Sequence, residues 1–206
     1  RIGTCTQSFG TLCSWLVDVL NLLSGHLDEP GGAMFPKAAA FADNTAGKPG
    51  QGRGVITGRH RSRVSGAPEV WGELPMTCLA EEIETSGEGQ VRALLTVATN
   101  PVLSAPNGPR LSRALARLEL LVCVDIYLNE TTRHAHLILP PSFGLEQDQY
   151  DLVFHALAVR NTARYAPALF PRDPGARNDW EILGGLARRI APERGLKARL
   201  LSAVAN

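Results

Sequence analysis

Residues 93–140 read ALLTVATNPVLSAPNGPRLSRALARLELLVCVDIYLNETTRHAHLILP, and short apolar runs alternate there with an amphipathic segment. Ala93–Ala98 and Leu120–Val124 are apolar runs of strand length, which predicts two buried strands. Between them, Leu111–Leu118 places leucines at helical spacing on one face and arginines around the other. A strand, an amphipathic helix and a second strand in this order are typical of parallel sheets. The segment therefore predicts an α/β fold with an open, mainly parallel sheet and flanking helices.

Hydrophobic spacing predicts further elements on both sides of this segment. The predicted helices are Thr11–Leu23, Met76–Glu84, Asn129–Ala135 and Ala176–Ile190, and a third strand is predicted at Leu137–Leu139. Gly25 follows the first helix directly, where a left-handed cap needs a residue without a side chain. The tail that ends at Asn206 is expected to be helical and basic.

Gly25–Pro68 differs in composition from the rest of the chain, because it contains nine glycines and four prolines. Residues of these two types break regular elements, so we expect a long loop here. A basic cluster lies inside this loop at Arg53, Arg59, Arg61 and Arg63. It is either a solvated loop or a cationic cover over an anionic substrate, a role that suits guanidinium groups.

Composition excludes several classes of protein. The chain has 206 residues and a formal net charge of +1, which gives no reason to expect nucleic acid or a membrane surface as a partner. The longest apolar run, Leu12–Leu23, contains Asp18 and is shorter than the roughly 20 residues that span a bilayer. The four cysteines have no C-x-x-C spacing, so we expect buried thiols rather than disulfides, a metal cage or nucleophiles.

Polar side chains follow both predicted strands of the central segment. Thr99, Asn100 and Pro101 follow the first strand, and Asp125 follows the second. Ligands of open parallel sheets bind at this edge, and a carboxylate can accept two parallel N–H donors such as those of guanine. The other interpretation is that Asp125 caps a turn and Asn100 closes a loop, which are ordinary roles for these residue types. The residues alone leave both interpretations open.

Several other motifs indicate no site. The sequence has no G-x-G-x-x-G, P-loop or G-x-S-x-G motif, which excludes the ordinary cradles for dinucleotides and triphosphates and the serine nucleophile elbow. His134 and His136 have no evident third metal ligand, so we expect ordinary turn and strand-edge roles. The acidic residues of the second predicted helix and its end are expected to form a solvated face, at Glu81, Glu82, Glu84 and Glu88.

Leu94–Pro140 resembles the molybdopterin oxidoreductases of the dimethyl-sulfoxide-reductase and formate-dehydrogenase type. The shared features are a strand ending in Asn-Pro, a helix, a strand ending in Val-x-Asp, a Thr-rich turn and a Leu-Pro strand end. LLSGHLDEPGGAMF (22–35) and GRHRSRVSGAPEVWGELP (58–75) are similar to earlier passages of that family. Together these segments cover most of residues 7–170.

The resemblance implies a cofactor and a set of residues that bind it. In the family, two α/β domains hold a pair of molybdopterin guanine dinucleotides around one molybdenum or tungsten. Residues 1–75 would end one such domain, 76–175 would form the strand-helix-strand part of the other, and 176–206 would be a helical segment. By resemblance, Asp125 takes the guanine edge, Arg63 contacts cofactor or substrate, and the remaining pocket residues are Thr99, Asn100, Pro101, Asn129, Glu130 and Thr131.

The chain also departs from the family pattern. It has Ala135-His136 where members have Ala-Asp, and residues 150–167 match only a subset of members. It contains neither the iron–sulfur cysteines nor a residue that matches the metal ligand, so an iron–sulfur cluster would belong to another part of a longer protein. Because the sequence begins with Arg1, we expect an internal piece of such a protein.

The expected function is therefore the cofactor-binding part of a cytoplasmic oxidoreductase. Its expected partners are the remaining polypeptide, a small-molecule substrate and an electron-transfer subunit, with no membrane insertion. The alternatives are a non-catalytic nucleotide-binding or interaction module, and a truncated product without activity of its own.

Overall fold

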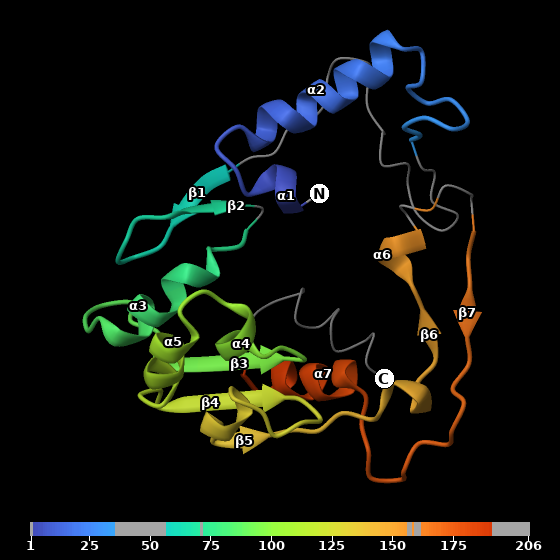
Figure 1. Cartoon of the computed structure of the whole chain (residues 1–206). Helices are drawn as coiled ribbons and strands as arrows, with labels where there is room; N and C mark the ends of the chain where they lie inside the picture. The colour runs from blue at the N-terminus through green and yellow to red at the C-terminus, as the bar shows by residue number, and fades with distance from the viewer. Residues whose placement is uncertain (1, 36–56, 71, 156–157, 159–161, 191–206) are drawn as a thin grey trace. The chain divides into compact units, whose positions relative to one another are not determined.

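The computed structural model describes residues 2–35, 57–70, 72–155, 158 and 162–190 (Figure 1). The chain divides into two compact units. Unit 1 comprises residues 1–53 and 148–167, and unit 2 comprises residues 54–147 and 168–206. The domain division expected from the sequence stays a prediction, because these units follow contacts within the chain and not a bound cofactor.

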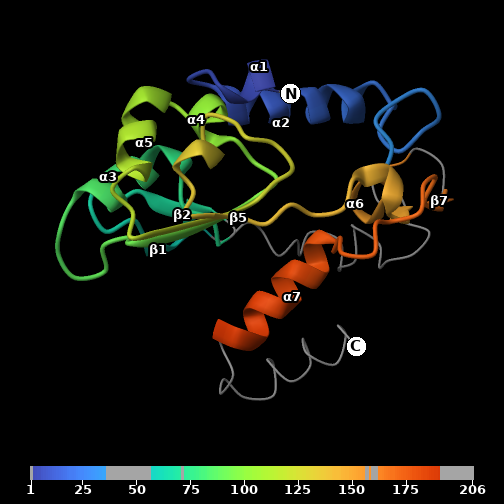
Figure 2. The same ribbon diagram turned by 90° about the horizontal axis from the view of Figure 1, so that it is seen from below.

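A three-stranded parallel sheet lies at the centre of unit 2. Its strand order is β3 (Ala93–Val97), β4 (Leu120–Val124) and β5 (Leu137–Ile138), and β3 and β4 pair in register from Ala93↔Leu120 to Val97↔Val124. The helices α4 (Pro101–Ser104) and α5 (Gly108–Leu115) connect β3 to β4 and lie on one side of the sheet in both ribbon views (Figures 1 and 2). This arrangement confirms the predicted α/β fold and its parallel sheet.

The core of unit 2 forms where α5 packs against β4. Leu115 and Leu121 are fully buried there, and Ile83 of α3 (Leu79–Glu84) completes the cluster. Removing these side chains from water stabilises the fold by about 25 cal/mol per Å² of apolar surface. The arginines of α5 remain outside this cluster, as the amphipathic spacing predicts.

Only one face of β3 is buried, so the prediction of a buried strand was wrong for the other face of β3. Leu94 and Thr96 face α5, whereas Leu95 and Val97 on the opposite face are 43% and 36% exposed. Successive side chains of a strand point to opposite faces, and no described residue buries this second face. An apolar run therefore did not distinguish a strand covered on two faces from a strand covered on one.

The turn between α4 and α5 needs two unusual backbone positions. Asn107 adopts a left-handed conformation with φ 57° and precedes the first turn of α5. At Gly108, an added Cβ would lie 2.0 Å from the carbonyl oxygen of Val102. Glycine is therefore required here, because α4 and α5 approach each other too closely for a side chain.

The predicted loop Gly25–Pro68 contains regular structure that the sequence did not indicate. β1 (Thr57–Arg61) pairs with β2 (Pro68–Val70) in an antiparallel hairpin of unit 2. The loop prediction was therefore wrong for 57–61, because Gly58 lies within β1 and Gly66 lies in the connection to β2, both with positive φ. Residues 36–56 of the predicted loop lie outside the described residues.

Most helical elements of unit 2 fall where the sequence predicts helices. η1 (Met76–Cys78) runs into α3, which confirms the helix predicted over Met76–Glu84. The remaining elements of unit 2 are η2 (Thr132–His134), η3 (Gly144–Glu146) and α7 (Asp179–Ile190). The predicted helical tail after Ile190 lies outside the described residues.

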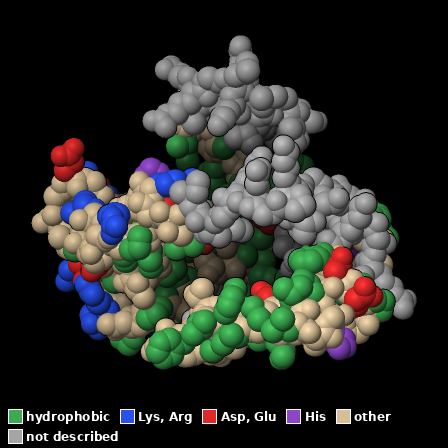
Figure 3. Space-filling model, turned by 90° about the horizontal axis from the view of Figure 1, so that it is seen from above, with side chains coloured by type: hydrophobic (Ala, Val, Ile, Leu, Met, Phe, Trp, Pro, Cys, Tyr) green, Lys and Arg blue, Asp and Glu red, His purple; other side chains and the backbone are tan. Residues whose placement is uncertain are grey.

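Unit 1 contains the N-terminal helices and a small hairpin. These elements are α1 (Ile2–Cys5), α2 (Gly10–Leu23), β6 (Gln149–Tyr150), α6 (Leu152–His155) and β7 (Tyr165–Ala166). Gly25 has φ 72° and its N–H bonds to Leu22 O at 3.2 Å, which confirms the predicted left-handed cap. The apolar side chains of α2 are exposed, Trp15 to 58% and Leu20 to 67%, and they lie along the lower edge of Figure 3. Among the described helices, none combines the length and the apolar character needed to cross a bilayer.

Candidate functional site

The two loops that the sequence analysis singled out lie beside each other at the carboxyl ends of β3 and β4. The N–H of Ala98 donates to Val124 O at 2.9 Å, which extends the pairing of the strands by one residue. Ala98 has φ 48°, so the chain turns sharply away from the sheet directly before Thr99. Parallel pairing therefore brings Thr99–Pro101 to the same edge as Asp125.

Asn100 connects these two loops through its side-chain amide. Its Oδ1 accepts from Thr131 Oγ1 at 2.7 Å, and its Nδ2 donates to Glu130 Oε2 at 2.8 Å. Thr131 Oγ1 also accepts from the N–H of Val102 in α4, at 3.2 Å. Thr131 is fully buried and Asn100 is half-buried, so the amide lies at the boundary between core and solvent.

Asn129 organises the loop that follows β4. Its Oδ1 accepts from the backbone N–H groups of Thr131 and Thr132, both at 2.9 Å, and its Nδ2 donates to Asp125 Oδ2 at 3.1 Å. Asp125 Oδ1 accepts from the N–H of Tyr127 at 2.9 Å. Each carboxylate oxygen can accept a second hydrogen bond, so Asp125 both shapes its turn and keeps acceptor capacity.

The ionisable groups of this edge differ in their environments. The hydrogen bond from Asn100 lowers the pKa of the Glu130 carboxyl, helped by its own backbone N–H and by Arg133, while burial acts in the opposite direction. Burial raises the pKa of the Cys123 thiol, and a hydrogen bond with Thr96 partly opposes this effect. Glu130 is therefore a carboxylate at neutral pH, and Cys123 stays a buried thiol of the core.

An apolar cavity of about 290 Å³ lies beside this edge of the sheet. Thr99 and Pro101 line it together with side chains of β3, α4 and the segment before α3, among them Leu95, Val97 and Met76. The loop after β3, which is hydrogen-bonded to the loop after β4, therefore borders this apolar cavity. This combination suits a ligand that has a flat apolar surface and a polar rim.

Arg63 lies apart from these loops, in contact with α3. Its Nε donates to Glu82 Oε2 at 3.2 Å and its Nη2 donates to Thr85 O at 2.6 Å. Glu82 is 7% exposed and also accepts from the N–H of Val64 at 2.9 Å, so the predicted solvated acidic face was wrong at this residue. The carboxylate is buried because Arg63 and Val64 supply its hydrogen bonds. The predicted contact of Arg63 with cofactor or substrate stays a prediction.

The basic cluster is built into the β1–β2 hairpin. Arg59 donates to Glu69 Oε1 through Nε at 3.2 Å and through Nη2 at 2.5 Å, and Glu69 is 1% exposed. Hydrogen bonds from Arg59 and from the N–H of Gly72 lower the pKa of Glu69 to about 2. Arg61 donates to Gly66 O at 2.8 Å. Arg59 and Arg61 therefore brace a hairpin rather than a loop, while both remain exposed to solvent, and Arg53 lies outside the described residues.

The two histidines occupy ordinary structural positions. Ser112 Oγ lies 2.9 Å from His134 Nε2, and His136 Nδ1 accepts from the N–H of Leu121 at 3.0 Å. Burial and the neighbouring Arg133 lower the pKa of His134. In the part of the chain that the structure describes, no group of three His, Cys, Asp or Glu residues could hold a metal ion.

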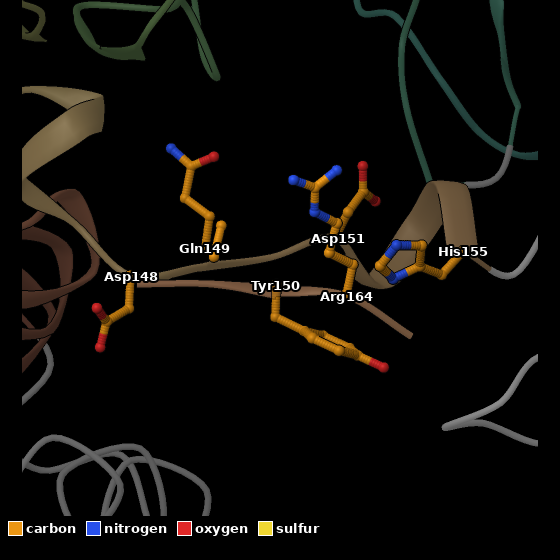
Figure 4. A pocket seen from close by; sticks show the side chains of 7 residues that line it. Asp148, Gln149, Tyr150, Asp151, His155 and Arg164 are labelled. Carbon is orange, nitrogen blue, oxygen red and sulfur yellow. The ribbon is translucent and has the colours of Figure 1, made fainter. Parts of the chain in front are cut away.

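A second hollow, of about 460 Å³, lies in unit 1, and none of the predicted site residues lines it. Figure 4 shows Tyr150 and His155 at one end of it, with their ring centroids 5.3 Å apart in an edge-to-face arrangement. Asp151 accepts from the N–H of Phe154 at 2.8 Å and so caps α6. The full lining is Asp148, Gln149, Tyr150, Asp151, His155, Arg164 and Ala166.

Comparison with known proteins identifies the family of this chain. The model of the molybdopterin oxidoreductase family matches residues 6–189. The chain belongs to this family. Membership implies a pterin cofactor that carries molybdenum or tungsten. The match extends over both loops at the carboxyl ends of β3 and β4.

Three relatives within the molybdopterin oxidoreductases illustrate this membership. The chain is 30% identical to the assimilatory nitrate reductase catalytic subunit of Bacillus subtilis over 149 residues, 69% of this chain and 20% of that protein. It is 34% identical to the NADPH-Fe(3+) oxidoreductase subunit alpha of Geobacter sulfurreducens over 61% of this chain and 15% of that protein. It is 31% identical to a nitrate reductase of Synechocystis over 91% of this chain and 27% of that protein. The chain thus spans 15–27% of the length of these relatives.

The structure brings together all the predicted pocket residues except Arg63. It also shows a partner that the sequence reasoning missed, Thr132, which is 1% exposed. Its Oγ1 accepts from the N–H of Asn129 at 2.7 Å and donates to Tyr127 O at 2.9 Å. The run Asn-Glu-Thr-Thr at 129–132 contains three residues whose side chains stabilise turns, so the residue pattern could have indicated this role.

Proposed function

We propose that the loops after β3 and β4 hold the guanosine end of a molybdopterin guanine dinucleotide in a molybdenum or tungsten oxidoreductase. The observation that carries this proposal is the hydrogen-bonded connection of Asn100 to Asp125 through Thr131 and Asn129. It fixes a donor and a carboxylate at the edge where parallel sheets bind nucleotides.

The groups present at this edge fit a guanine nucleoside. Asp125 keeps acceptor capacity for the N–H donors of a guanine edge, and Asn100 offers an amino group to an acceptor atom. The apolar cavity of about 290 Å³ beside Thr99 suits a planar ring. Asp125 and Glu130 are both acidic and disfavour a phosphate in contact with them, so the phosphates would point away from these two residues.

When bound, the cofactor supplies a metal centre that exchanges electrons with the substrate. The residues of this chain bind and orient its nucleotide end, some by direct contact and others by holding a neighbouring side chain, and the positions at this edge are Thr99, Asn100, Pro101, Asp125, Asn129, Glu130 and Thr131. Glu130 belongs to the second group, because it is paired with Asn100. The metal ligand belongs to another part of a longer protein in this proposal. Orientation of this kind is the contribution that a protein makes to cofactor chemistry.

The partners of the whole protein are part of the same proposal. They are the remaining polypeptide, a small-molecule substrate and an electron-transfer subunit, in a cytoplasmic location. The names of relatives support a subunit partner, since one is a catalytic subunit and another a subunit alpha.

Analysis of the natively purified protein tests the proposal. We expect molybdenum or tungsten in near-stoichiometric amount and one guanine nucleotide released per pterin on acid hydrolysis. Asp125→Ala should lower the guanine and metal content together, since removing one partner of a polar contact costs about 1–3 kcal/mol. Asp179→Ala, at an exposed carboxylate of the same unit, should leave both unchanged. A pterin without guanine, or full occupancy in Asp125→Ala, would exclude the proposed role.

A further inference from the structure

The orientation of the Asn100 amide follows from its hydrogen-bond partners. The backbone N–H of Val102 can only donate, so Thr131 Oγ1 accepts from it at 3.2 Å. The single proton of the Thr131 hydroxyl is then directed to Asn100 Oδ1, 2.7 Å away. The amide oxygen of Asn100 therefore faces the protein, and its amino group faces outward.

Thr131 itself is out of reach of a ligand. It is 0% exposed, and its backbone N–H is held by Asn129 Oδ1 at 2.9 Å. Its hydroxyl has both functions occupied, one by Val102 and one by Asn100. The residue can act on a ligand only through the direction in which it turns Asn100.

Glu130 occupies one of the two N–H donors of the outward amino group of Asn100. Its Oε2 accepts from Asn100 Nδ2 at 2.8 Å, and the Glu130 side chain is exposed and able to move away. A carboxylate offers only acceptors, so it takes the position that an acceptor atom of a nucleotide would take. The chain thus carries an internal substitute for the ligand at this position.

We propose that Thr131 is a positioning residue that turns the amino group of Asn100 toward the ligand, and that Glu130 holds one N–H donor of this group until an acceptor atom of a purine nucleotide takes its place. This inference rests on the proposed nucleotide site. It adds that Glu130 pairs with Asn100 first and that the nucleotide then replaces it. Binding exchanges the hydrogen bond between Asn100 and Glu130 for one between Asn100 and the nucleotide. Glu130 therefore weakens the affinity of the site for the nucleotide and keeps an N–H donor of Asn100 hydrogen-bonded when the site is empty.

Titration of GMP into the full chain, followed by calorimetry, tests the exchange. Glu130→Ala removes the competitor and should tighten GMP binding about two- to tenfold, the range expected for one net hydrogen bond. Glu130→Gln keeps an acceptor for Asn100 and should bind GMP within about twofold of the unchanged chain. Equal affinities for Glu130→Ala and Glu130→Gln would overturn the role assigned to Glu130.

Two further variants test the orientation of Asn100. Asn100→Asp keeps an acceptor for Thr131 but replaces the outward donor by an acceptor, and it should weaken GMP binding about tenfold or more. Thr131→Val removes the hydroxyl and should weaken binding to a similar degree, whereas Thr131→Ser should retain it. Because Asn100→Asp preserves the inward contact, it remains informative if Thr131→Val does not fold. Unchanged affinity in Asn100→Asp would overturn the assigned orientation.

The outcomes separate this inference from the proposed function. If the unchanged chain and Glu130→Ala both fail to bind GMP at millimolar concentration, the nucleotide site itself is wrong. If GMP binds and Asp125→Ala weakens it while the Glu130 and Asn100 variants have no effect, the site stands and the exchange is wrong.

Discussion

Replacement of Asn129 by alanine should destabilise unit 2 more than any other single change at its candidate site. The Asn129 Oδ1 atom is the acceptor for the N–H groups of both Thr131 and Thr132, at 2.9 Å each. These two residues are 0% and 1% exposed, so the alanine variant leaves two buried donors without their partner. Each unpaired buried group costs about 1–3 kcal/mol.

The expected total is smaller than the sum of the two upper limits. Asn129 is half-buried, so water can reach part of the space that its side chain leaves. We therefore expect a loss of about 2–4 kcal/mol in the free energy of unfolding. Urea denaturation of the full chain, followed by far-UV circular dichroism, measures this loss. With a slope of about 2 kcal/mol per molar urea, the midpoint should fall by roughly 1–2 M.

Glu130→Gln is the matched control for this measurement. The glutamine keeps an acceptor for Asn100 and leaves no buried group unpaired, so its unfolding free energy should stay within about 0.5 kcal/mol of the unchanged chain. If the unfolding free energy of Asn129→Ala also stays within that margin, the backbone N–H groups of Thr131 and Thr132 do not need Asn129 as their acceptor. An equal loss in both variants would show that the loop responds to any change of side chain.

Three other changes test the supports of the fold. The pKa of Glu69 in the folded chain is about 2, below its ordinary value of 4.5. The ionised carboxylate therefore stabilises the fold above pH 4.5, and this stabilisation is lost as the pH falls toward 2. Glu69→Gln weakens the pairing with Arg59, so it should flatten this part of the pH dependence of the urea midpoint. Gly108→Ala places a Cβ 2.0 Å from Val102 O and should cost about 1–3 kcal/mol, seen as a lower melting temperature. Leu115→Ala, at a residue 0% exposed, should cost about 2–5 kcal/mol in the same denaturation assay.

Each of these changes has a matched control in the same unit. Glu88→Gln, at an exposed carboxyl, should leave the acid limb of the pH profile as it is. Gly175→Ala, where an added Cβ meets nothing within 4 Å, should leave the melting temperature unchanged. Leu103→Ala, at a side chain 68% exposed, should have little effect on the urea midpoint. A variant that behaves like its control would contradict the contact assigned to it.

Local patterns predicted the central elements of the fold well. The apolar runs around Leu95 and Val122 became β3 and β4, and the leucine spacing between them became α5. These predictions succeed because the period of side-chain burial is a local property of a helix or a strand. The β1–β2 hairpin was missed because its pairing joins residues on both sides of a turn within a segment rich in glycine.

The sequence predicted the position of the candidate site but not the hydrogen bonds that connect its residues. Residue types at strand ends indicated Asn100 and Asp125, and the family resemblance added Asn129, Glu130 and Thr131. Sequence spacing could not show that Thr131 is buried or that it directs the amide of Asn100. It also could not show that Arg63 is held by α3, because its partner Glu82 comes from an element that was expected to face solvent.

The sequence by itself determined the class of the fold, the parallel order of its central strands and the family to which the chain belongs. Tertiary structure alone decided which carboxylates are buried and paired, which face of β3 is covered, and which group of Asn100 faces outward. The physical reason is that burial and hydrogen-bond direction depend on atoms far apart in the chain, such as Val102 and Thr131, which meet only when the strands pair.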